Sequence, residues 1–250
     1  MDIEADCYVV IDLLRATTTI ATLFERGLKS LVAVDDISRA RLLAAEGTKL
    51  LFTGLSGQRP VLFGEIGGRR PEGFAHGNSP LEASEADIGG REAILVTSNG
   101  TQALCTLADH GQVAAGAIAN ASAIARWAAE FDRVVLVCAG TAAGRRFGLD
   151  DFAAAGVLVN RLVRLCPGIE VGDAAGLAMS SAGYDDWLAS AMPQQVGKSA
   201  RLVTGSEHAR YLVSIGFGRD VHFAVQEDTS SAVPVAVGCG PGWAVLEDRR

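Results

Sequence analysis

The end of the first apolar run carries a concentration of polar side chains. The run YVVID finishes at Asp12, and Arg15 and a run of three threonines starting at Thr17 follow it directly. A carboxylate can hold a metal ion or move a proton, while guanidinium and hydroxyl groups donate hydrogen bonds to oxyanions. The residue types and their spacing therefore indicate a site for an anionic ligand at the end of a strand.

Arg15 falls in the first turn of the helix predicted for residues 13–27. The helix dipole disfavours a cation there, whereas the unpaired N–H groups of a helix start attract anions. We therefore expect an anion to lie between Arg15 and the helix, with Thr17 and Thr18 donating hydrogen bonds to it. The structural alternative is that the threonines pack the helix on the sheet, with their hydroxyls bonded to helix carbonyls.

A second polar turn, TSNGT, follows another apolar run. Asn99 and Gly100 form a strong turn signal, so a plain strand-to-helix turn is one interpretation. The segment also places the hydroxyls of Ser98 and Thr101 and several backbone N–H groups at a helix start, which suits an anion nest. On this second interpretation Asn99, Gly100 and Thr101 bind substrate.

Carboxylates recur at predicted strand ends and loop–helix junctions. Two of them, Asp150 and Asp151, are also good N-cap candidates for the helix predicted at 149–165. A carboxylate beside an anion nest fits a bridging divalent cation, because Mg²⁺ takes one or two carboxylates together with water and substrate oxygens. Acids, arginine and helix starts together indicate phosphate-ester chemistry. The acids in such positions are Asp12, Glu65, Asp150, Asp151, Asp173 and Asp220.

The scaffold for these residues is a repeated pattern of a short apolar run followed by a helix-period segment. The pattern predicts an α/β fold in which βα units build a mainly parallel sheet with helices on both faces. Two α/β lobes with late strands at a sheet edge are a variant of this architecture. The predicted strands, with their tips, are 8–12, 31–34, 92–100, 113–120 and 133–140, and the late ones are 220–226, 233–237 and 243–247. The predicted helices are 13–27, 35–47, 101–111, 121–131, 149–165 and 206–216, with Gly27, Gly47 and Gly216 at helix ends.

The glycine-rich stretch Gly64–Gly77 has almost no apolar periodicity and leads into the turn-forming sequence GNSP. Loops of this length are usually functional, so we predict a functional internal loop, with a disordered excursion as the alternative. No low-complexity linker divides the chain. We therefore treat residues 1–250 as one domain, with lobes at about 1–130 and 131–250 as the alternative.

Composition limits the classes of partner. The chain has 250 residues, 49% of them hydrophobic, and a formal charge of −7, which is typical of a globular protein and argues against a nucleic-acid partner. No apolar run reaches the roughly 20 residues of a membrane helix, and the acidic start is unlike a secretory signal. The five cysteines lack CxxC pairing, which fits reduced, buried thiols. We expect a cytoplasmic homodimer that binds a small phosphoester.

A set of short motifs occurs in a fixed order along the chain. They are VVIDLLRATTT, GE at Gly64, EGF followed by GNSP, SNGT, NA at Asn120, CAG, LDDFAAAG, DAA and the late GRDVHF followed by VP. Together they resemble the 2-phosphosulfolactate phosphatase family, Mg²⁺-dependent enzymes associated with coenzyme M biosynthesis. The resemblance extends from about Tyr8 to Pro234. It implies an α/β phosphohydrolase that releases phosphate from (R)-2-phospho-3-sulfolactate.

The motifs select the site residues, and the chemistry of each side chain suggests its role. Asp12, Arg15 and Glu65 are predicted to be catalytic, and Asp12 and Asp151 are predicted to bind Mg²⁺. The predicted substrate-binding residues are Thr17, Thr18, Asn78, Ser79, Asn99, Gly100 and Thr101. The chain departs from the family pattern at Ala75 and His76, where an acid usually precedes the NSP turn. If that acid acts in catalysis, its loss impairs activity.

Several alternatives remain open at this stage. The nucleophile is either a water molecule activated by the metal or by a carboxylate, or Asp12 itself through an aspartyl-phosphate. The chain could also act on a different phospho-acid, or bind small anions without turnover, which the missing acid at Ala75 motivates. A serine or cysteine hydrolase is disfavoured because no G-x-S-x-G elbow is present.

Overall fold

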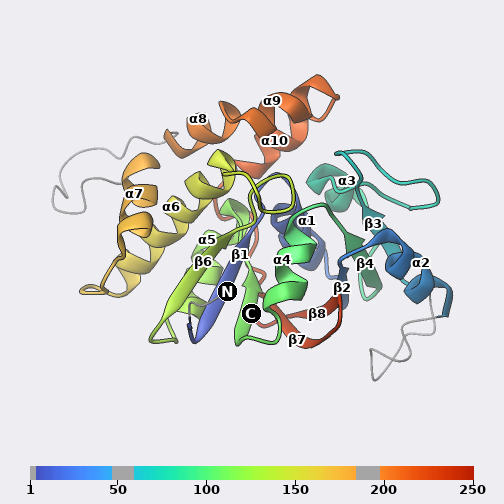
Figure 1. Ribbon diagram of the computed structural model, residues 1–250, viewed down its shortest axis with the longest axis horizontal. Helices are drawn as coiled ribbons and strands as arrows, with labels where there is room; N and C mark the ends of the chain where they lie inside the picture. The colour runs from blue at the N-terminus through green and yellow to red at the C-terminus, as the bar shows by residue number, and fades with distance from the viewer. Residues whose placement is uncertain (1–3, 47–58, 184–197) are drawn as a thin grey trace.

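The computed structural model describes residues 4–46, 59–183 and 198–250, which form one eight-stranded sheet flanked by helices (Figure 1). The strands are β1 (Cys7–Ile11), β2 (Ser30–Val34), β3 (Val61–Gly64), β4 (Glu92–Val96), β5 (Gln112–Ala115), β6 (Val134–Cys138), β7 (Pro234–Gly240) and β8 (Trp243–Asp248). The helices are α1 (Ala16–Glu25), α2 (Ile37–Glu46), α3 (Pro80–Glu85), α4 (Gly100–Leu107), the 3₁₀ helix η2 (Ile118–Asn120), α5 (Ala121–Ala128), α6 (Leu149–Leu165), α7 (Asp173–Ser181), α8 (Lys198–Thr204), α9 (Glu207–Ser214) and α10 (Gly218–Ala224). The predicted α/β architecture is confirmed.

The late strands lie in the middle of the sheet, so their predicted position at an edge is wrong. The strand order is β3-β4-β2-β8-β7-β5-β1-β6, with β7 and β8 forming an antiparallel hairpin between two parallel groups. The physical reason is burial of β8 on both faces. Val245 packs in one apolar cluster, whereas Ala244 and Leu246 pack in another. A strand with two apolar faces belongs in the interior of a sheet.

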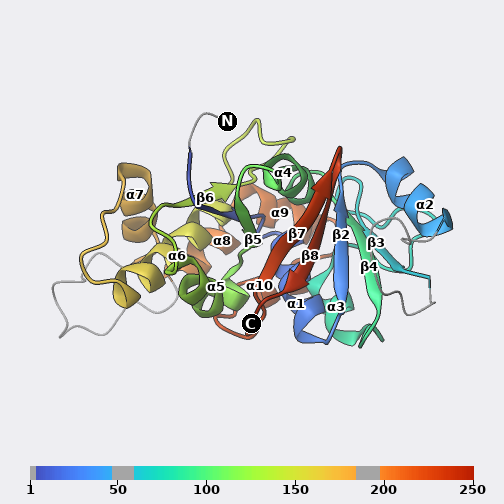
Figure 2. The same ribbon diagram turned by 90° about the horizontal axis from the view of Figure 1, so that it is seen from below.

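The hairpin also sets the relative direction of the two parallel groups. Because β8 runs antiparallel to β2 and β7 runs antiparallel to β5, the groups run in opposite senses along the ladder. Figure 2 shows the hairpin crossing between them. Sheet twist accumulates from strand to strand, and residues that follow strands of both groups line one cavity, described below. Helix α4 joins the groups by contacting both β2 and β1.

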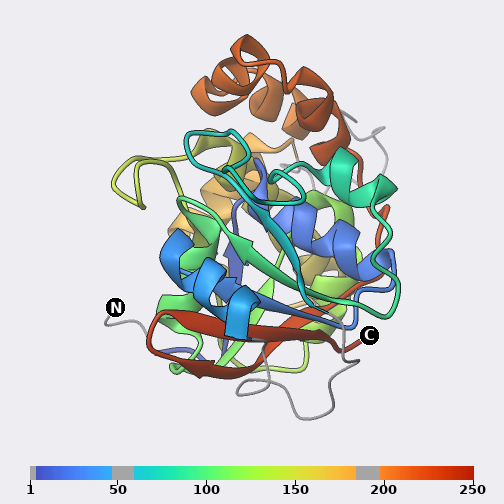
Figure 3. The same ribbon diagram turned by 90° about the vertical axis from the view of Figure 1, so that its right-hand side faces the viewer.

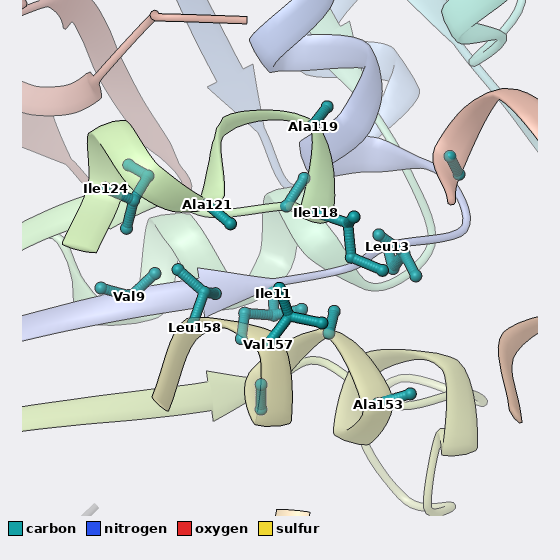
Figure 4. Close-up of a cluster of buried hydrophobic side chains, with 14 of the residues drawn as sticks. Val9, Ile11, Leu13, Ile118, Ala119, Ala121, Ile124, Ala153, Val157 and Leu158 are labelled. Atoms are coloured by element: carbon teal, nitrogen blue, oxygen red, sulfur yellow. The ribbon is translucent and has the colours of Figure 1, made fainter. Parts of the chain in front are cut away.

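Strand β1 is buried on both faces by simple alternation. Val9 and Ile11 point into the apolar cluster formed with α5 and α6 (Figure 4), whereas Tyr8 and Val10 belong to the cluster that contains residues of α1 and α4. This two-sided burial confirms the prediction of helices on both faces. It also fixes the position of the end of β1, which Asp12 follows directly.

The C-terminal third contains more helix than the pattern predicted. The strand predicted at 220–226 is wrong, because α10 covers these residues up to Ala224. Val221 and Ala224 are buried while His222 is exposed, which is the spacing of a helix face. Figures 1 and 3 show α8, α9 and α10 as a layer beyond the ends of α6 and α3. The predicted helix end at Gly47 lies outside the described residues.

The described cysteines are free thiols, with Cys7 buried and the other four half-buried. Burial raises the pKa of the Cys7 thiol to about 12, and it does the same for two others, Cys105 and Cys138. These three thiols are therefore poor nucleophiles in the folded protein. Across the residues that the structure describes, no helix is long and apolar enough to cross a membrane.

Candidate active site

A cavity of about 220 Å³ collects residues that follow four strands and adds residues from α9. Asp12 follows β1, Glu65 follows β3, Ser98 and Asn99 follow β4, and Thr141 follows β6. Five of the residues predicted for the site therefore line one space: Asp12, Arg15, Glu65, Asn78 and Asn99. The other lining residues are Leu14, Gly67, Gly68, Ser98, Thr141, Ala142, His208, Tyr211 and Leu212.

Asp12 is held by the starts of two helices. Its Oδ2 accepts a 2.7 Å hydrogen bond from the backbone N–H of Gly100, at the start of α4, and its Oδ1 accepts a longer one of 3.4 Å from Ala16, at the start of α1. Burial raises the pKa of Asp12 to about 6, against the opposing effects of His208 and the Ala16 N–H. The Oδ1 atom is thus the less engaged oxygen of this carboxylate.

Glu65 connects the loop that follows β3 to the turn that follows β4. One carboxylate oxygen accepts from the N–H of Ser98 at 2.6 Å, and the other accepts from the N–H of Gly68 at 2.7 Å. Tyr211 on α9 donates to the carbonyl of Gly67 at 2.9 Å. The loop predicted at 64–77 is therefore tied to β4 and to α9 at the cavity wall, as expected of a functional loop rather than a disordered one.

Arg15 has a protein counter-ion, which corrects the expectation that an anion alone offsets its charge. Its guanidinium lies 2.7 Å from the carboxylate of Asp220 on α10, and both side chains are 2% exposed. It also donates to the carbonyl of Gly68 at 2.7 Å and stacks over the ring of Phe217, 4.1 Å from its centre. The Ser79 hydroxyl donates to the other Asp220 oxygen at 2.7 Å. Arg15 therefore fastens α10 and the loop after β3 to the start of α1.

The Asp151 carboxylate connects two backbone segments beside the site. Its two oxygens accept 2.8 Å hydrogen bonds from the N–H groups of Leu13 and Gly140. Burial raises the pKa of Asp151 well above its usual range, and the charges of Asp150 and Asp12 raise it further. Neither acid of the pair caps α6, because the N-cap residue is Gly148. Their predicted role as caps is wrong, although both lie in the first turn of α6.

Several predicted binding residues lie behind the cavity wall. The Thr17 hydroxyl donates to the Asp12 carbonyl at 3.0 Å, and the Thr18 hydroxyl donates to the Leu13 carbonyl at 2.8 Å. The Thr101 hydroxyl donates to a backbone carbonyl in the same way, and Ser79 caps α3 by accepting from Glu82. These side chains are buried. In the structure these side chains support the turns, which is the alternative considered for the threonines, and their contact with substrate stays a prediction.

Two cavity residues on α9 escaped the motif search, although the helix itself was predicted. His208 and Tyr211 stand three residues apart, so they share a helix face. The Nδ1 atom of His208 lies 3.3 Å from an oxygen of Asp150. The available signal was a histidine and a tyrosine at helical spacing beside buried Ala209 and Leu212. Only the docking of α9 distinguishes that signal from a surface pair.

The donor set of the cavity fits a hard divalent cation. The Oδ1 atom of Asn78 is buried and accepts no hydrogen bond from the described residues, and Asp12 lines the same space. Oxygen donors of this kind suit Mg²⁺, which needs only one or two protein carboxylates. Within the described ranges no three His, Cys, Asp or Glu side chains converge on one point. Water and substrate oxygens would therefore complete the coordination.

The departure from the family pattern lies away from these groups. Ala75 is exposed and does not line the cavity. The ring of His76 stacks on Phe63 with 4.6 Å between the ring centres. The side chain at position 75 therefore lies on a surface loop, away from the residues that line the cavity.

Sequence comparisons agree with this arrangement. The family model described as 2-phosphosulpholactate phosphatase matches residues 2–238. A protein of Thermotoga petrophila is 34% identical over 94% of this chain and 91% of its own length. Proteins of Deinococcus radiodurans and Thermus thermophilus are also 34% identical, over 93% of this chain and 88% and 89% of their own lengths. Each is named probable 2-phosphosulfolactate phosphatase.

The family match covers nearly the whole chain, and three relatives exceed 30% identity over nine-tenths of it. The resemblance inferred from the ordered motifs is therefore confirmed. The chain belongs to the 2-phosphosulpholactate phosphatase family.

Proposed function

We propose that this chain is a Mg²⁺-dependent phosphatase that hydrolyses (R)-2-phospho-3-sulfolactate to 3-sulfolactate and phosphate. The observation that carries the proposal is a small cavity in which Asp12 sits at the starts of two helices, opposite Glu65 and beside Arg15. Helix starts bind phosphoryl oxygens, and fixed donors stabilise the charge that develops during phosphoryl transfer. The names of the relatives support this substrate. A role in coenzyme M biosynthesis and a cytoplasmic location are part of the same proposal.

The charges at the cavity are the argument for a cation. Asp12 and Glu65 line the cavity, Asp150 is close enough to raise the pKa of Asp12, and Arg15 is already paired with Asp220. A phosphate dianion entering this site meets net negative charge. Bound Mg²⁺ would supply positive charge to the phosphoryl oxygens. Asp12 and Asn78, which line the cavity, are the residues suited to hold it, and Asp151 is less suited because it does not line the cavity.

The attacking group remains a choice between water and Asp12. Among the described residues, the Oδ1 atom of Asp12 accepts only the 3.4 Å contact from Ala16, so it can accept a proton from water or attack phosphorus directly. Rapid acid quench of a single turnover, followed by mass spectrometry, separates the routes. A phosphorylated peptide containing Asp12 indicates the covalent route, and unmodified peptide with burst-free kinetics indicates water.

A binding module without turnover is the second candidate. The missing acid at Ala75 suggested this candidate, but position 75 is exposed and lies outside the cavity. A substitution there leaves Asp12, Arg15 and Glu65 in place. We therefore favour the phosphatase.

A phosphate-release screen tests the proposal. Small 2-phospho-acids, including (R)-2-phospho-3-sulfolactate, are assayed with Mg²⁺ and with EDTA, using wild type, Asp12→Asn and the matched control Asp173→Asn. Asp173 is an exposed acid in the first turn of α7. We expect Mg²⁺-dependent release by wild type and the control, and loss of at least about 10³-fold in Asp12→Asn. Ligand-induced stabilisation without phosphate release would favour the binding module.

A further inference from the structure

His208 has no assigned role in the proposed reaction, yet it lines the same cavity as Asp12. It enters from α9, the layer beyond the strand ends, and its side chain is 20% exposed. Its Nδ1 lies 3.3 Å from Asp150 on α6, so the ring is oriented by a residue from a different element. This arrangement leaves Nε2 as the ring nitrogen for a ligand.

Asp150 is built to hold a protonated partner. Its side chain is 2% exposed and its Oδ1 accepts no hydrogen bond from the described residues. A buried carboxylate is costly unless it is paired. His208 is the ion-pair partner given to Asp150 by the structure, and a charged imidazole satisfies that need better than a neutral one.

Hydrolysis of an alkyl phosphoester is helped by a group that can donate a proton. The leaving alkoxide is strongly basic, so a proton delivered as the P–O bond breaks lowers the barrier. We propose that His208 is the general acid that protonates the leaving-group oxygen, with Asp150 as its positioning residue. This role rests on the phosphatase function proposed above.

The step balances without an additional reactant. The bond between phosphorus and the ester oxygen breaks, and its electron pair stays on that oxygen, which takes the Nε2 proton of His208. A bond forms between phosphorus and the oxygen of water, and the proton lost from that water passes to a carboxylate or to solvent. His208 becomes neutral and is reprotonated by solvent, so the sum is ester plus water giving alcohol plus phosphate.

The groups that face His208 favour its charged form. Burial lowers the pKa of His208, but the hydrogen bond and charge of Asp150 on α6 and the charge of Asp12 after β1 raise it, while Arg15 before α1 opposes them. The net direction is upward from the ordinary value. The imidazole is thus protonated at neutral pH more often than a free histidine.

Leaving-group dependence tests the role. Wild type, His208→Gln and the control His110→Gln are compared on (R)-2-phospho-3-sulfolactate and on acetyl phosphate, whose carboxylate leaving group needs no proton. His110 is a half-exposed histidine paired with adjacent Asp109, outside the cavity. We expect His208→Gln to lose about 10²- to 10⁴-fold in kcat on the alkyl ester with little change in KM, and less than about 10-fold on acetyl phosphate.

Other outcomes have distinct meanings. Equal losses on both substrates, or no loss on the alkyl ester, would overturn the role of His208 alone. A wild type that releases no phosphate from (R)-2-phospho-3-sulfolactate would overturn the proposed function, and the general-acid role with it.

Two further readouts do not depend on acetyl phosphate. Imidazole in solution should restore alkyl-ester turnover to His208→Ala, and ¹⁵N NMR of the imidazole should show a lower pKa in Asp150→Asn than in wild type. Absence of both effects would also overturn the proposal.

Discussion

Backbone N–H groups fix the carboxylates around the cavity. Asp12, Glu65 and Asp151 each accept two such bonds, from residues on different segments. The carboxylate positions therefore depend on backbone geometry rather than on flexible side chains. This rigidity is the preorganisation that electrostatic catalysis requires, and it makes small changes in the supporting backbone costly for activity.

Gly100 offers a test at the residue scale. A Cβ atom on Gly100 would lie 2.7 Å from both Asp12 Oδ2 and Ala16 Cβ, so α4 or Asp12 has to move. We expect Gly100→Ala to lower kcat/KM by about 10²-fold, because a shift of about 1 Å at a reacting group has that effect. The control Gly238→Ala adds a Cβ that meets no other part of the described chain within 4 Å. Equal activity of the two variants in the phosphate-release assay would contradict the prediction.

At the scale of elements, the site is assembled by helices that are distant in sequence. Arg15 before α1 pairs with Asp220 on α10, and Tyr211 on α9 reaches the loop after β3. Asp150 on α6 meets His208 on α9. The layer of α8, α9 and α10 packs on the apolar cluster through residues such as Val203, Leu212 and Val221, and the polar contacts of the site add to this packing.

The Arg15–Asp220 pair has a measurable coupling. Removing one member leaves the other charge buried without its counter-ion, which costs about 3–5 kcal/mol. We expect Arg15→Met and Asp220→Leu each to lower the free energy of unfolding by about that amount in urea titrations. The double variant should lose less than the sum of the two. Strict additivity would show that the pair carries no interaction energy in the fold.

The packing of α7 on α6 gives a second test at this scale, away from the cavity. A Cβ on Gly156 of α6 would lie 2.1 Å from the carbonyl oxygen of Ala178 on α7. One on Gly176 of α7 would meet no atom of the described residues closer than 4.0 Å. We expect Gly156→Ala to destabilise the protein by about 1–3 kcal/mol and Gly176→Ala to stabilise it by about 0.5–1 kcal/mol. Thermal unfolding measures both, and the same sign for both would contradict this packing.

On the scale of the whole molecule, charge opposes the proposed ligand. The chain carries a formal charge of −7, and carboxylates gather around its cavity. A multiply anionic phosphoester approaches such a protein against an average repulsion. Local cations must overcome it, which is why the proposed Mg²⁺ is central to the account. A homodimer is expected because dimers are the commonest protein oligomers. It stays a prediction, and sedimentation velocity measures the oligomeric state directly.

Mg²⁺ and phosphate should therefore stabilise the protein together. A ligand present at 100 times its dissociation constant adds about 2.7 kcal/mol to the free energy of unfolding. We expect phosphate to raise Tm in the presence of Mg²⁺ and to have little effect with EDTA, at matched ionic strength. Asp12→Asn should lose most of this protection. Equal protection by phosphate with and without Mg²⁺ would mean that the protein alone supplies the positive charge.

The sequence by itself determined the alternation of strand and helix and five of the residues at the cavity. Short apolar runs and glycine-ended helices are local signals, and Asp12, Glu65 and Asn99 stand where such runs stop. In open α/β sheets, ligands bind as a rule at the carboxyl ends of the strands. Local pattern was therefore enough to select these residues and, through the ordered motifs, the family.

Tertiary structure alone decided which groups meet. The partner of Arg15 lies 205 positions away, and the docking of α9 brings His208 to Asp150. The central position of β7 and β8 depends on burial of β8 on two faces, which a short apolar run does not reveal. Tertiary packing buries the Thr17 and Thr18 side chains, and their hydroxyls donate to backbone carbonyls five residues earlier. Each of these outcomes depends on long-range packing, whereas sequence periodicity reports only the local preference of a segment.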